Sequence, residues 1–153
     1  MRFQSAVLLL VSAGRIANAH GGRAELPANL QAEVQRLGCQ VPDAESVIRG
    51  QFERAGVTDW AVLCSRARTT TLLVFWNGKE LGSSELLKTY DGDGQHLATR
   101  RIVAVDKKFI VKYCEGARGN VPAFNHQGIR DGFNGEVVHY YHQGKWLDLT
   151  VRQ

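Results

Sequence analysis

The stretch DWAVLCSRARTTTLLVFWNG, residues 59–78, decides the fold of this chain. Asp59 to Ser65 and Thr70 to Trp76 are dense apolar runs of strand length, separated by a short polar stretch. Such runs predict buried strands when turn residues bound them. Asn77-Gly78 follows the second run directly, and this dipeptide is the strongest short-range hairpin signal that a sequence carries. We therefore expect two adjacent buried strands followed by a tight turn.

One helix is predicted on the N-terminal side of these strands, over residues 27–37. Apolar residues recur at helical spacing on one of its faces: Leu30, Val34 and Leu37. Pro27 suits the first turn of a helix, and Gly38 is typical of the residue that follows its end. Residues 46–52 alternate between apolar and polar side chains, which predicts a strand.

The C-terminal half alternates predicted strands with turns. The strands are expected over residues 98–104, 108–113, 136–142 and 145–151. Residues 81–87 fit either a strand or a short helical turn, and residues 129–133 fit one turn of helix. Asp91-Gly92-Asp93-Gly94 is predicted to be a plain loop, and Gln143-Gly144 to be the turn of the last hairpin.

The order of these elements predicts the fold class. Strands that follow one another without long intervening helices favour antiparallel pairing. We therefore expect an α+β fold, in which an N-terminal helix packs on a mainly antiparallel sheet of about six or seven short strands. Neither a linker nor an internal repeat divides the sequence, so residues 20–153 are expected to form a single domain.

Residues 1–19 have the pattern of a cleavable signal peptide. Arg2 gives a positive start, Ala6 to Ala13 form a short apolar run, and Ala17-Asn18-Ala19 supplies the small residues of a cleavage site. The alternative interpretation is a buried N-terminal helix. No later stretch reaches the ~20 apolar residues that a membrane-spanning helix needs, so we expect no membrane span. The pattern predicts a secreted or periplasmic protein.

The charge of the chain does not indicate a polyanionic partner. The sequence has 19 lysines and arginines against 15 acidic residues, a net charge of +4. Loss of Arg2 and Arg15 with the signal peptide would leave +2. The basic residues are scattered, apart from short pairs such as Arg100-Arg101 and Lys107-Lys108. We therefore expect no nucleic-acid partner.

The three cysteines are Cys39, Cys64 and Cys114. Cysteines of exported proteins tend to pair, and three of them allow one bridge. We predict a Cys39–Cys64 disulfide, which would join the end of the helix to the first buried strand, with Cys114 left as a buried thiol at the end of a strand. The sequence has no Cys-x-x-Cys motif and no cysteine and histidine at ligand spacing, which argues against a zinc site.

Residues 50–63, GQFERAGVTDWAVL, resemble one repeat of the FG-GAP or VCBS type. The matching residues are Gly50, Phe52, Gly56, Asp59 and the pair Ala61-Val62. In that family the loop joins two strands of a propeller blade and binds calcium through acidic or amide oxygens. A propeller needs about four or more blades. The resemblance therefore implies the loop and not the propeller.

The resemblance places the calcium ligands at Gln51, Glu53, Ala55 and Asp59. Ala55 has no side-chain oxygen and Gln51 is neutral, whereas calcium prefers several carboxylate oxygens. We therefore expect a structural loop, in which Asp59 accepts hydrogen bonds from the loop backbone and Gly56 adopts a conformation that favours glycine. Calcium binding through Glu53 and Asp59 stays as an alternative.

His20 is a candidate copper ligand. Cleavage after Ala19 would make His20 the N-terminal residue, with an amine and an imidazole that can chelate the metal. Copper(II) suits such nitrogen ligands, and copper-dependent polysaccharide oxygenases share an N-terminal histidine. The alternative is an N-terminus without a ligand. We expect no cofactor, with calcium and copper as the two metals left open.

Two further groups of residues are candidate sites. His139 and Tyr141 share one face of a predicted strand, and with Trp146 of the next strand they form a candidate ligand face. The alternative is ordinary aromatic packing across the strands. His126 and Asp131 lie in a loop-rich stretch and are candidates for a catalytic base and the residue that orients it. The alternative for this pair is hydrogen bonding that shapes a loop.

Residues 139–149, HYYHQGKWLDL, are similar to the ends of small exported bacterial domains of unknown function. This likeness carries no catalytic residue, and the sequence has none of the common catalytic motifs. We therefore expect an exported non-catalytic binding or structural module, with an extracytoplasmic protein or glycan as its partner. The alternative is a small secreted metal-dependent or hydrolytic enzyme that uses His20 or the region of His126 and Asp131.

Overall fold

The computed structural model describes residues 24–67, 69–79, 84–90, 100–117, 122–132 and 136–152. The predicted signal peptide, His20 and the predicted loop at Asp91-Gly94 lie outside these ranges. Within them, no helix is both long and apolar enough to cross a membrane.

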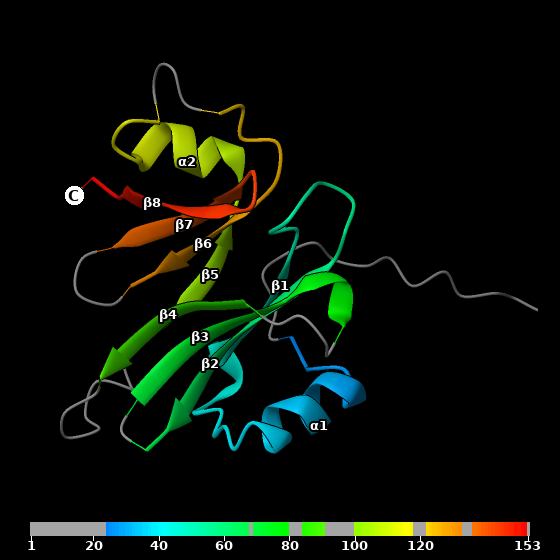
Figure 1. Ribbon diagram of the computed structural model, residues 1–153. Helices are drawn as coiled ribbons and strands as arrows, with labels where there is room; N and C mark the ends of the chain where they lie inside the picture. The colour runs from blue at the N-terminus through cyan, green and yellow to red at the C-terminus, as the bar shows by residue number, and fades with distance from the viewer. Residues whose placement is uncertain are drawn as a thin grey trace, which may run out of the picture.

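The described residues form four layers, in which two antiparallel sheets lie between two helices (Figure 1). Sheet A consists, in spatial order, of β1 (Val47–Gly50), β2 (Asp59–Arg66), β3 (Thr69–Phe75) and β4 (Ser84–Tyr90). Sheet B consists of β5 (Ile102–Val105), β6 (Gly128–Asp131), β7 (Val137–His142) and β8 (Lys145–Thr150). Helix α1 (Ala28–Arg36) covers the outer face of sheet A, and α2 (Lys107–Tyr113) covers the outer face of sheet B. A one-turn helix, η1 (Ala44–Ser46), leads into β1.

Sheet A needs a layer on each side because both of its faces are apolar. β2 is buried from Asp59 to Cys64, and β3 is buried from Thr70 to Phe75. The side chains toward α1, which pack with Leu30 and Val34, are Trp60, Val62, Cys64, Leu73 and Phe75. Those that pack toward sheet B are Ala61, Leu63, Leu72 and Val74. Strands whose successive side chains enter two different cores must be apolar throughout, which is why residues 59–76 show no alternation.

Sheet B divides its side chains between α2 and sheet A. Val138 and Tyr140 pack with Ile110 of α2, whereas Ile102 and Ile129 pack against sheet A. The hairpin of β7 and β8 turns at Gln143 and Gly144, with φ of 49° and 81°. These left-handed residues form the two-residue turn that the sequence predicts.

The antiparallel α+β class is confirmed, as is the predicted helix over residues 27–37. The expectation of one sheet is wrong, because the strands divide into two sheets of four. The reason lies in the double-sided burial of β2 and β3, which a single helix cannot cover. Of the two alternatives for residues 81–87, the strand is the one observed over the described part, which begins β4 at Ser84; residues 81–83 lie outside the described residues.

The strand predicted over residues 108–113 is instead helix α2. The carboxylate of Asp106 accepts a hydrogen bond from Phe109 N at 2.8 Å. A cap of this kind begins a helix by satisfying a free backbone N–H, and it overrides the apparent alternation of the following residues. Cys114 therefore follows a helix, where it is fully buried and unpaired. Burial raises the pKa of its thiol, which keeps the sulfur protonated and unreactive.

The helical turn predicted over residues 129–133 is also wrong, because Gly128–Asp131 form β6. A Cβ atom on Gly128 would lie 2.8 Å from Val138 Cγ1, so glycine lets β6 approach β7 closely. The residues of this strand point in alternate directions, which carries Asp131 into the layer between the sheets together with Ile129.

Asn77-Gly78 do not form a two-residue hairpin. They belong to a one-turn helix, η2 (Trp76–Gly78), and β4 begins only at Ser84. Asn77 and Gly78 do have the left-handed φ values of 53° and 62° that this dipeptide favours. The turn is therefore present, but Asn77 N is hydrogen-bonded to Asp59 rather than to the next strand.

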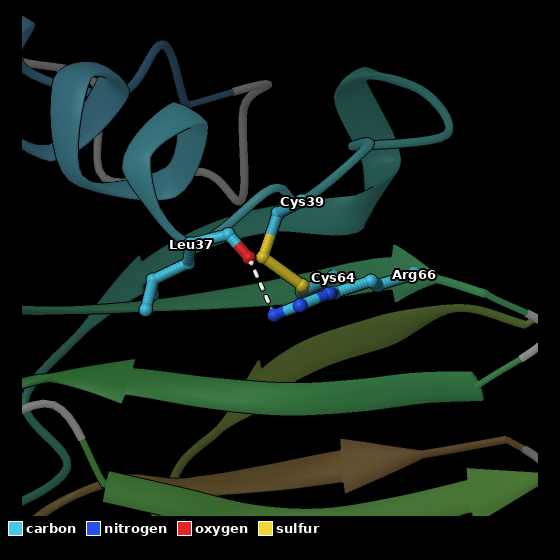
Figure 2. The surroundings of a disulfide bond; sticks show 4 residues. All are labelled: Leu37, Cys39, Cys64 and Arg66. Carbon is cyan, nitrogen blue, oxygen red and sulfur yellow. Dashed lines mark hydrogen bonds between the residues drawn. A yellow bond between two sulfur atoms is a disulfide. The ribbon is translucent and has the colours of Figure 1, made fainter.

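The predicted Cys39–Cys64 pair is confirmed, with a Cα–Cα distance of 5.0 Å (Figure 2). Cys39 follows the end of α1, and Cys64 lies on the side of β2 that faces the helix. Beside the sulfur atoms, Arg66 Nη1 donates a hydrogen bond to the carbonyl oxygen of Leu37 at 3.2 Å. The disulfide and this hydrogen bond together fasten the end of α1 to sheet A.

Replacing Cys39 or Cys64 by alanine is expected to lower the free energy of unfolding by about 3 kcal/mol, because the bridge restricts the unfolded chain. Cys114→Ala is expected to cost only about 1 kcal/mol of lost packing. Urea denaturation of the oxidised protein measures both effects. Equal and large losses for all three variants would contradict the pairing.

Candidate functional site

Asp59, at the start of β2, holds the loop that resembles an FG-GAP repeat. Its Oδ2 accepts hydrogen bonds from Phe52 N at 2.7 Å and Glu53 N at 2.9 Å, and its Oδ1 accepts one from Asn77 N at 2.8 Å. Asp59 is fully buried. The carboxylate thus joins the loop after β1 to the turn after β3. The predicted hydrogen bonds to the loop backbone are present, and Asn77 is a partner that the sequence did not indicate.

The remaining predicted loop residues also have structural surroundings. Gly56 has a φ of 81°, and its N–H donates to Gln51 Oε1 at 3.0 Å. Phe52 is fully buried, and a Cβ atom on Gly50 would lie 2.5 Å from its ring. Gln127 joins the same loop to sheet B through two hydrogen bonds of 2.9 Å each. Its side-chain Oε1 accepts one from Gln51 N, and its backbone N–H donates the other to the carbonyl oxygen of Gln51.

The oxygens named as calcium ligands are therefore occupied within the loop. Both oxygens of Asp59 and the oxygen of Gln51 accept backbone N–H groups, and Glu53 pairs with Arg54 at 3.8 Å. In the part of the chain that the structure describes, no three histidine, cysteine or acidic side chains gather as metal ligands. His20, the candidate copper ligand, lies outside the described residues.

Asp59→Ala is expected to destabilise the protein by at least about 3 kcal/mol, because it leaves three backbone N–H groups without their acceptor. Thermal unfolding with calcium and with a chelator should show the same loss. Glu53→Ala, in the same loop, serves as the control and should change little. A loss for Asp59→Ala that appears only with calcium would show that the loop binds the metal.

The predicted ligand face is only partly assembled. Tyr141 and Trp146 lie opposite each other on β7 and β8, with ring centroids 5.1 Å apart. His139 shares their side of the hairpin, but only 4% of its side chain is exposed. The third aromatic ring is that of Trp76, which follows β3. Its ring centroid lies 4.7 Å from that of Tyr141 and 5.6 Å from that of Trp146. We call Trp76, Tyr141 and Trp146 the aromatic triad.

The aromatic triad spans both sheets at one end of the layer between them. Each of its three side chains is partly exposed. Trp76 continues the alternation of Leu72 and Val74, which places it on the side of sheet A that meets sheet B. This alternation is the sequence feature that indicates which side of sheet A carries Trp76. It does not reveal which strands of the other sheet lie opposite. The hydrogen bond from Asn77 N to Asp59 fixes the turn beside Trp76.

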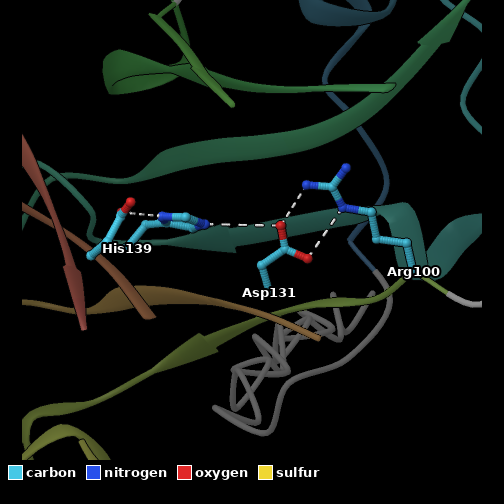
Figure 3. Close-up of polar contacts among 4 residues, drawn as sticks. Arg100, Asp131 and His139 are labelled. Atoms are coloured by element: carbon cyan, nitrogen blue, oxygen red, sulfur yellow. Dashed lines mark hydrogen bonds and ion pairs between the residues drawn. The ribbon is translucent and has the colours of Figure 1, made fainter. Parts of the chain in front are cut away.

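Four polar residues form a chain across sheet B, and we call them the polar chain: Arg100, Asp131, His139 and Asp148 (Figure 3). Arg100 donates to both oxygens of Asp131, from Nε at 3.2 Å and from Nη2 at 2.5 Å. His139 Nε2 lies 3.9 Å from Asp131 Oδ2, which is ion-pair distance rather than hydrogen-bond distance. His139 Nδ1 lies 2.6 Å from Asp148 Oδ1. The chain thereby joins the start of β5 to β6, β7 and β8.

Burial and charge act in opposite directions along this chain. Burial alone would lower the pKa of His139, but the carboxylates of Asp131 and Asp148 outweigh it and hold the pKa above its ordinary value of 6.5. Burial alone would raise the pKa of Asp131, but His139 and Arg100 outweigh it and hold the pKa below its ordinary value of 3.8. Folding therefore favours protonated His139 together with ionised Asp131.

His126 and Asp131, the candidates for a catalytic base and the residue that orients it, do not lie together. His126 stacks on Tyr140 with ring centroids 4.3 Å apart, and its Nδ1 lies 3.0 Å from Gln127 O. Tyr140 belongs to the face of sheet B that meets α2, whereas Asp131 points with Ile129 into the layer between the sheets. The histidine that lies beside Asp131 is His139, whose two ring nitrogens both face carboxylates. Neither nitrogen faces solvent to accept a proton from a substrate.

Comparison with known proteins gives no template for this site. No family model matches the chain, and no curated protein or solved structure is significantly similar to it. Function must therefore be inferred from the aromatic triad and the polar chain themselves.

Proposed function

We propose that this chain is an exported, non-catalytic binding module, and that the aromatic triad is its ligand face. The observation that carries the proposal is the gathering of three partly exposed rings from η2, β7 and β8 at one end of the sandwich. Aromatic side chains give large contact areas at little cost in conformational entropy, and they dominate the energetics of recognition surfaces.

Export is supported by the signal-peptide pattern and by the Cys39–Cys64 pair. Disulfides persist in the periplasm and outside the cell, where proteins that carry a signal peptide function. The proposed module is residues 20–153, acting in one of these compartments.

The shape of the face favours an extended ligand. Two clefts of about 610 and 370 Å³ open beside α1 and the disulfide, away from the triad. Neither of these two clefts is lined by the triad, and we take the three partly exposed rings as a platform. An extended ligand, such as a glycan or a surface segment of a protein, can lie across such a platform.

The rings of the triad are uncharged, and stacking on uncharged rings suits a neutral glycan. Cation–ring contacts of the described residues lie elsewhere, with Lys112 over Tyr113 and Arg130 over Phe109. The indole N–H of Trp146 is buried and donates no hydrogen bond to the described residues. A hydroxyl or carbonyl oxygen of a ligand could accept it if the ring shifts slightly. A sugar ring offers both an apolar face for stacking and such oxygens.

Calorimetric titration with neutral oligosaccharides of hexoses and N-acetylhexosamines tests this proposal. Trp146→Ala and Trp76→Ala are expected to weaken binding at least about tenfold, as the loss of an aromatic anchor typically does. Tyr113→Ala removes an exposed ring of α2 that lies outside the triad, so it should leave affinity unchanged. Thermal melts of each variant would establish that the fold persists.

Two results would contradict the glycan ligand. One is the absence of binding by any oligosaccharide of the set. The other is binding that Tyr113→Ala weakens as much as Trp146→Ala does. Binding of a purified envelope protein that Trp76→Ala abolishes would replace the glycan by a protein partner at the same face.

A further inference from the structure

The two carboxylates that flank His139 favour a positive charge on its ring. If only Nδ1 carried a proton, the lone pair of Nε2 would face Asp131 Oδ2, another acceptor, at 3.9 Å. If only Nε2 carried a proton, the lone pair of Nδ1 would face Asp148 Oδ1 at 2.6 Å. Only the doubly protonated imidazolium directs an N–H toward each carboxylate. Nε2 is buried without a hydrogen-bond partner among the described residues, so its link to Asp131 at 3.9 Å is an attraction between charges and not a hydrogen bond.

Among the described side chains, His139 lies beside the carboxylates of Asp131 on β6 and Asp148 on β8, and Arg100 before β5 pairs with Asp131. Sheet A adds one buried carboxylate on its facing side, Asp59, whose oxygens accept three backbone N–H groups. The other described side chains that point from β1, β2 and β3 toward sheet B are apolar or carry a hydroxyl: Ile48, Ala61, Leu63, Ser65, Thr70, Leu72 and Val74. Helix α2 and its lysines lie behind sheet B, on the side away from His139.

Part of the polar chain and part of the aromatic triad are adjacent within the hairpin of β7 and β8. In the register of β7 and β8, His139 pairs with Asp148 and Tyr141 pairs with Trp146. These two pairs lie on the same face and are two residues apart, a separation of about 7 Å. The charged pair therefore borders the strand positions that carry the two rings, and Trp76 contacts both rings.

We infer that protonated His139 is a pH-dependent lock on the aromatic triad, so that the triad is held in its binding arrangement in acid and released as the solution becomes alkaline. This inference rests on the proposed function for its biological meaning, because it describes the regulation of the same site. When His139 loses its proton, Arg100 still neutralises Asp131, and Asp148 can turn to water because 67% of its side chain is exposed. The loss therefore loosens the hairpin without leaving an unpaired buried charge.

The direction of the pH dependence follows from the raised pKa of His139. The stabilisation is complete below the ordinary value of 6.5 and is lost as the pH rises through the pKa of the folded protein. Asp131 has the opposite dependence, since its contribution is present above 3.8 and is lost in acid. The lock is therefore closed in mildly acidic solution and opens as the pH rises through the raised pKa of His139.

Near-ultraviolet circular dichroism of the oxidised Trp60→Phe protein tests the lock. Trp60 lies under α1, so its removal leaves Trp76 and Trp146, both in the triad, as the remaining tryptophans. The signal is expected to change in one reversible step above about pH 6.5. In this background, His139→Gln should abolish the step, whereas His142→Gln, on the other face of the same strand, should preserve it.

A second variant keeps the test valid if His139→Gln does not fold. Asp148→Asn removes one of the two carboxylates that favour the imidazolium, at an exposed position. It should move the midpoint to lower pH by up to about one unit. A step that survives His139→Gln, a midpoint that Asp148→Asn leaves in place, or the absence of any step in the Trp60→Phe parent would overturn the lock.

Ligand binding separates this inference from the proposed function. An oligosaccharide that binds the triad in acid should bind less tightly at about pH 8.5. Its affinity should fall by up to about tenfold for each unit by which ligand binding raises the pKa of His139. A dichroism step without carbohydrate binding would overturn the glycan ligand and leave the lock intact. Binding of equal strength at both pH values, with no dichroism step, would overturn the lock and leave the ligand face intact.

Discussion

The constraint on which the structure depends is the presence of buried charges between two apolar sheets. The side chains of Arg100, Asp131 and His139 are 1%, 3% and 4% exposed, and each must be compensated within the layer that they occupy. An isolated buried charge costs several kcal/mol, whereas a chain of alternating charges satisfies each member by its neighbours. Because the chain runs from the residue Arg100 before β5 across β6, β7 and β8, this compensation also fixes the positions of these strands relative to one another. Two members of the aromatic triad, Tyr141 and Trp146, lie next to His139 and Asp148 on the hairpin of β7 and β8.

Sheet A reaches the same end of the sandwich through a different buried carboxylate. Asp59 holds the loop after β1 and the turn that carries Trp76, and the paired hydrogen bonds of Gln51 and Gln127 connect that loop to sheet B. The disulfide acts at the opposite face of sheet A, where it fastens α1. Each element that presents the triad is therefore anchored by a polar or covalent contact as well as by apolar packing. Such anchoring lets three large rings remain partly exposed without collapsing into the core.

The sequence predicts the elements that depend on local patterns of residues. It does not predict the contacts between strands that are distant in the sequence. The apolar runs at residues 59–76, the helix before them, the last hairpin and the Cys39–Cys64 pair could all be predicted. The alternation of residues 108–113 predicts a strand where helix α2 lies, although Asp106 before it is a residue type that favours the N-cap position. His139 was assigned to the ligand face from its alternation with Tyr141. Its burial depends on Asp131 and Asp148, and no local pattern pairs those residues across sheet B. Trp76 was missed for the same reason, since its partners belong to the other sheet.

The most direct test of the charged layer is a nitrogen-15 NMR titration of the His139 imidazole in the oxidised protein, assigned by comparison with His139→Gln. Both ring nitrogens are expected to show the chemical shifts of an imidazolium at about pH 6.5, where an ordinary histidine is half protonated. The midpoint should then lie at a higher pH than that of an unstructured peptide. A neutral ring at that pH, with one nitrogen showing the shift of a lone pair, would contradict the alternating charges of the polar chain and with them the lock on the aromatic triad.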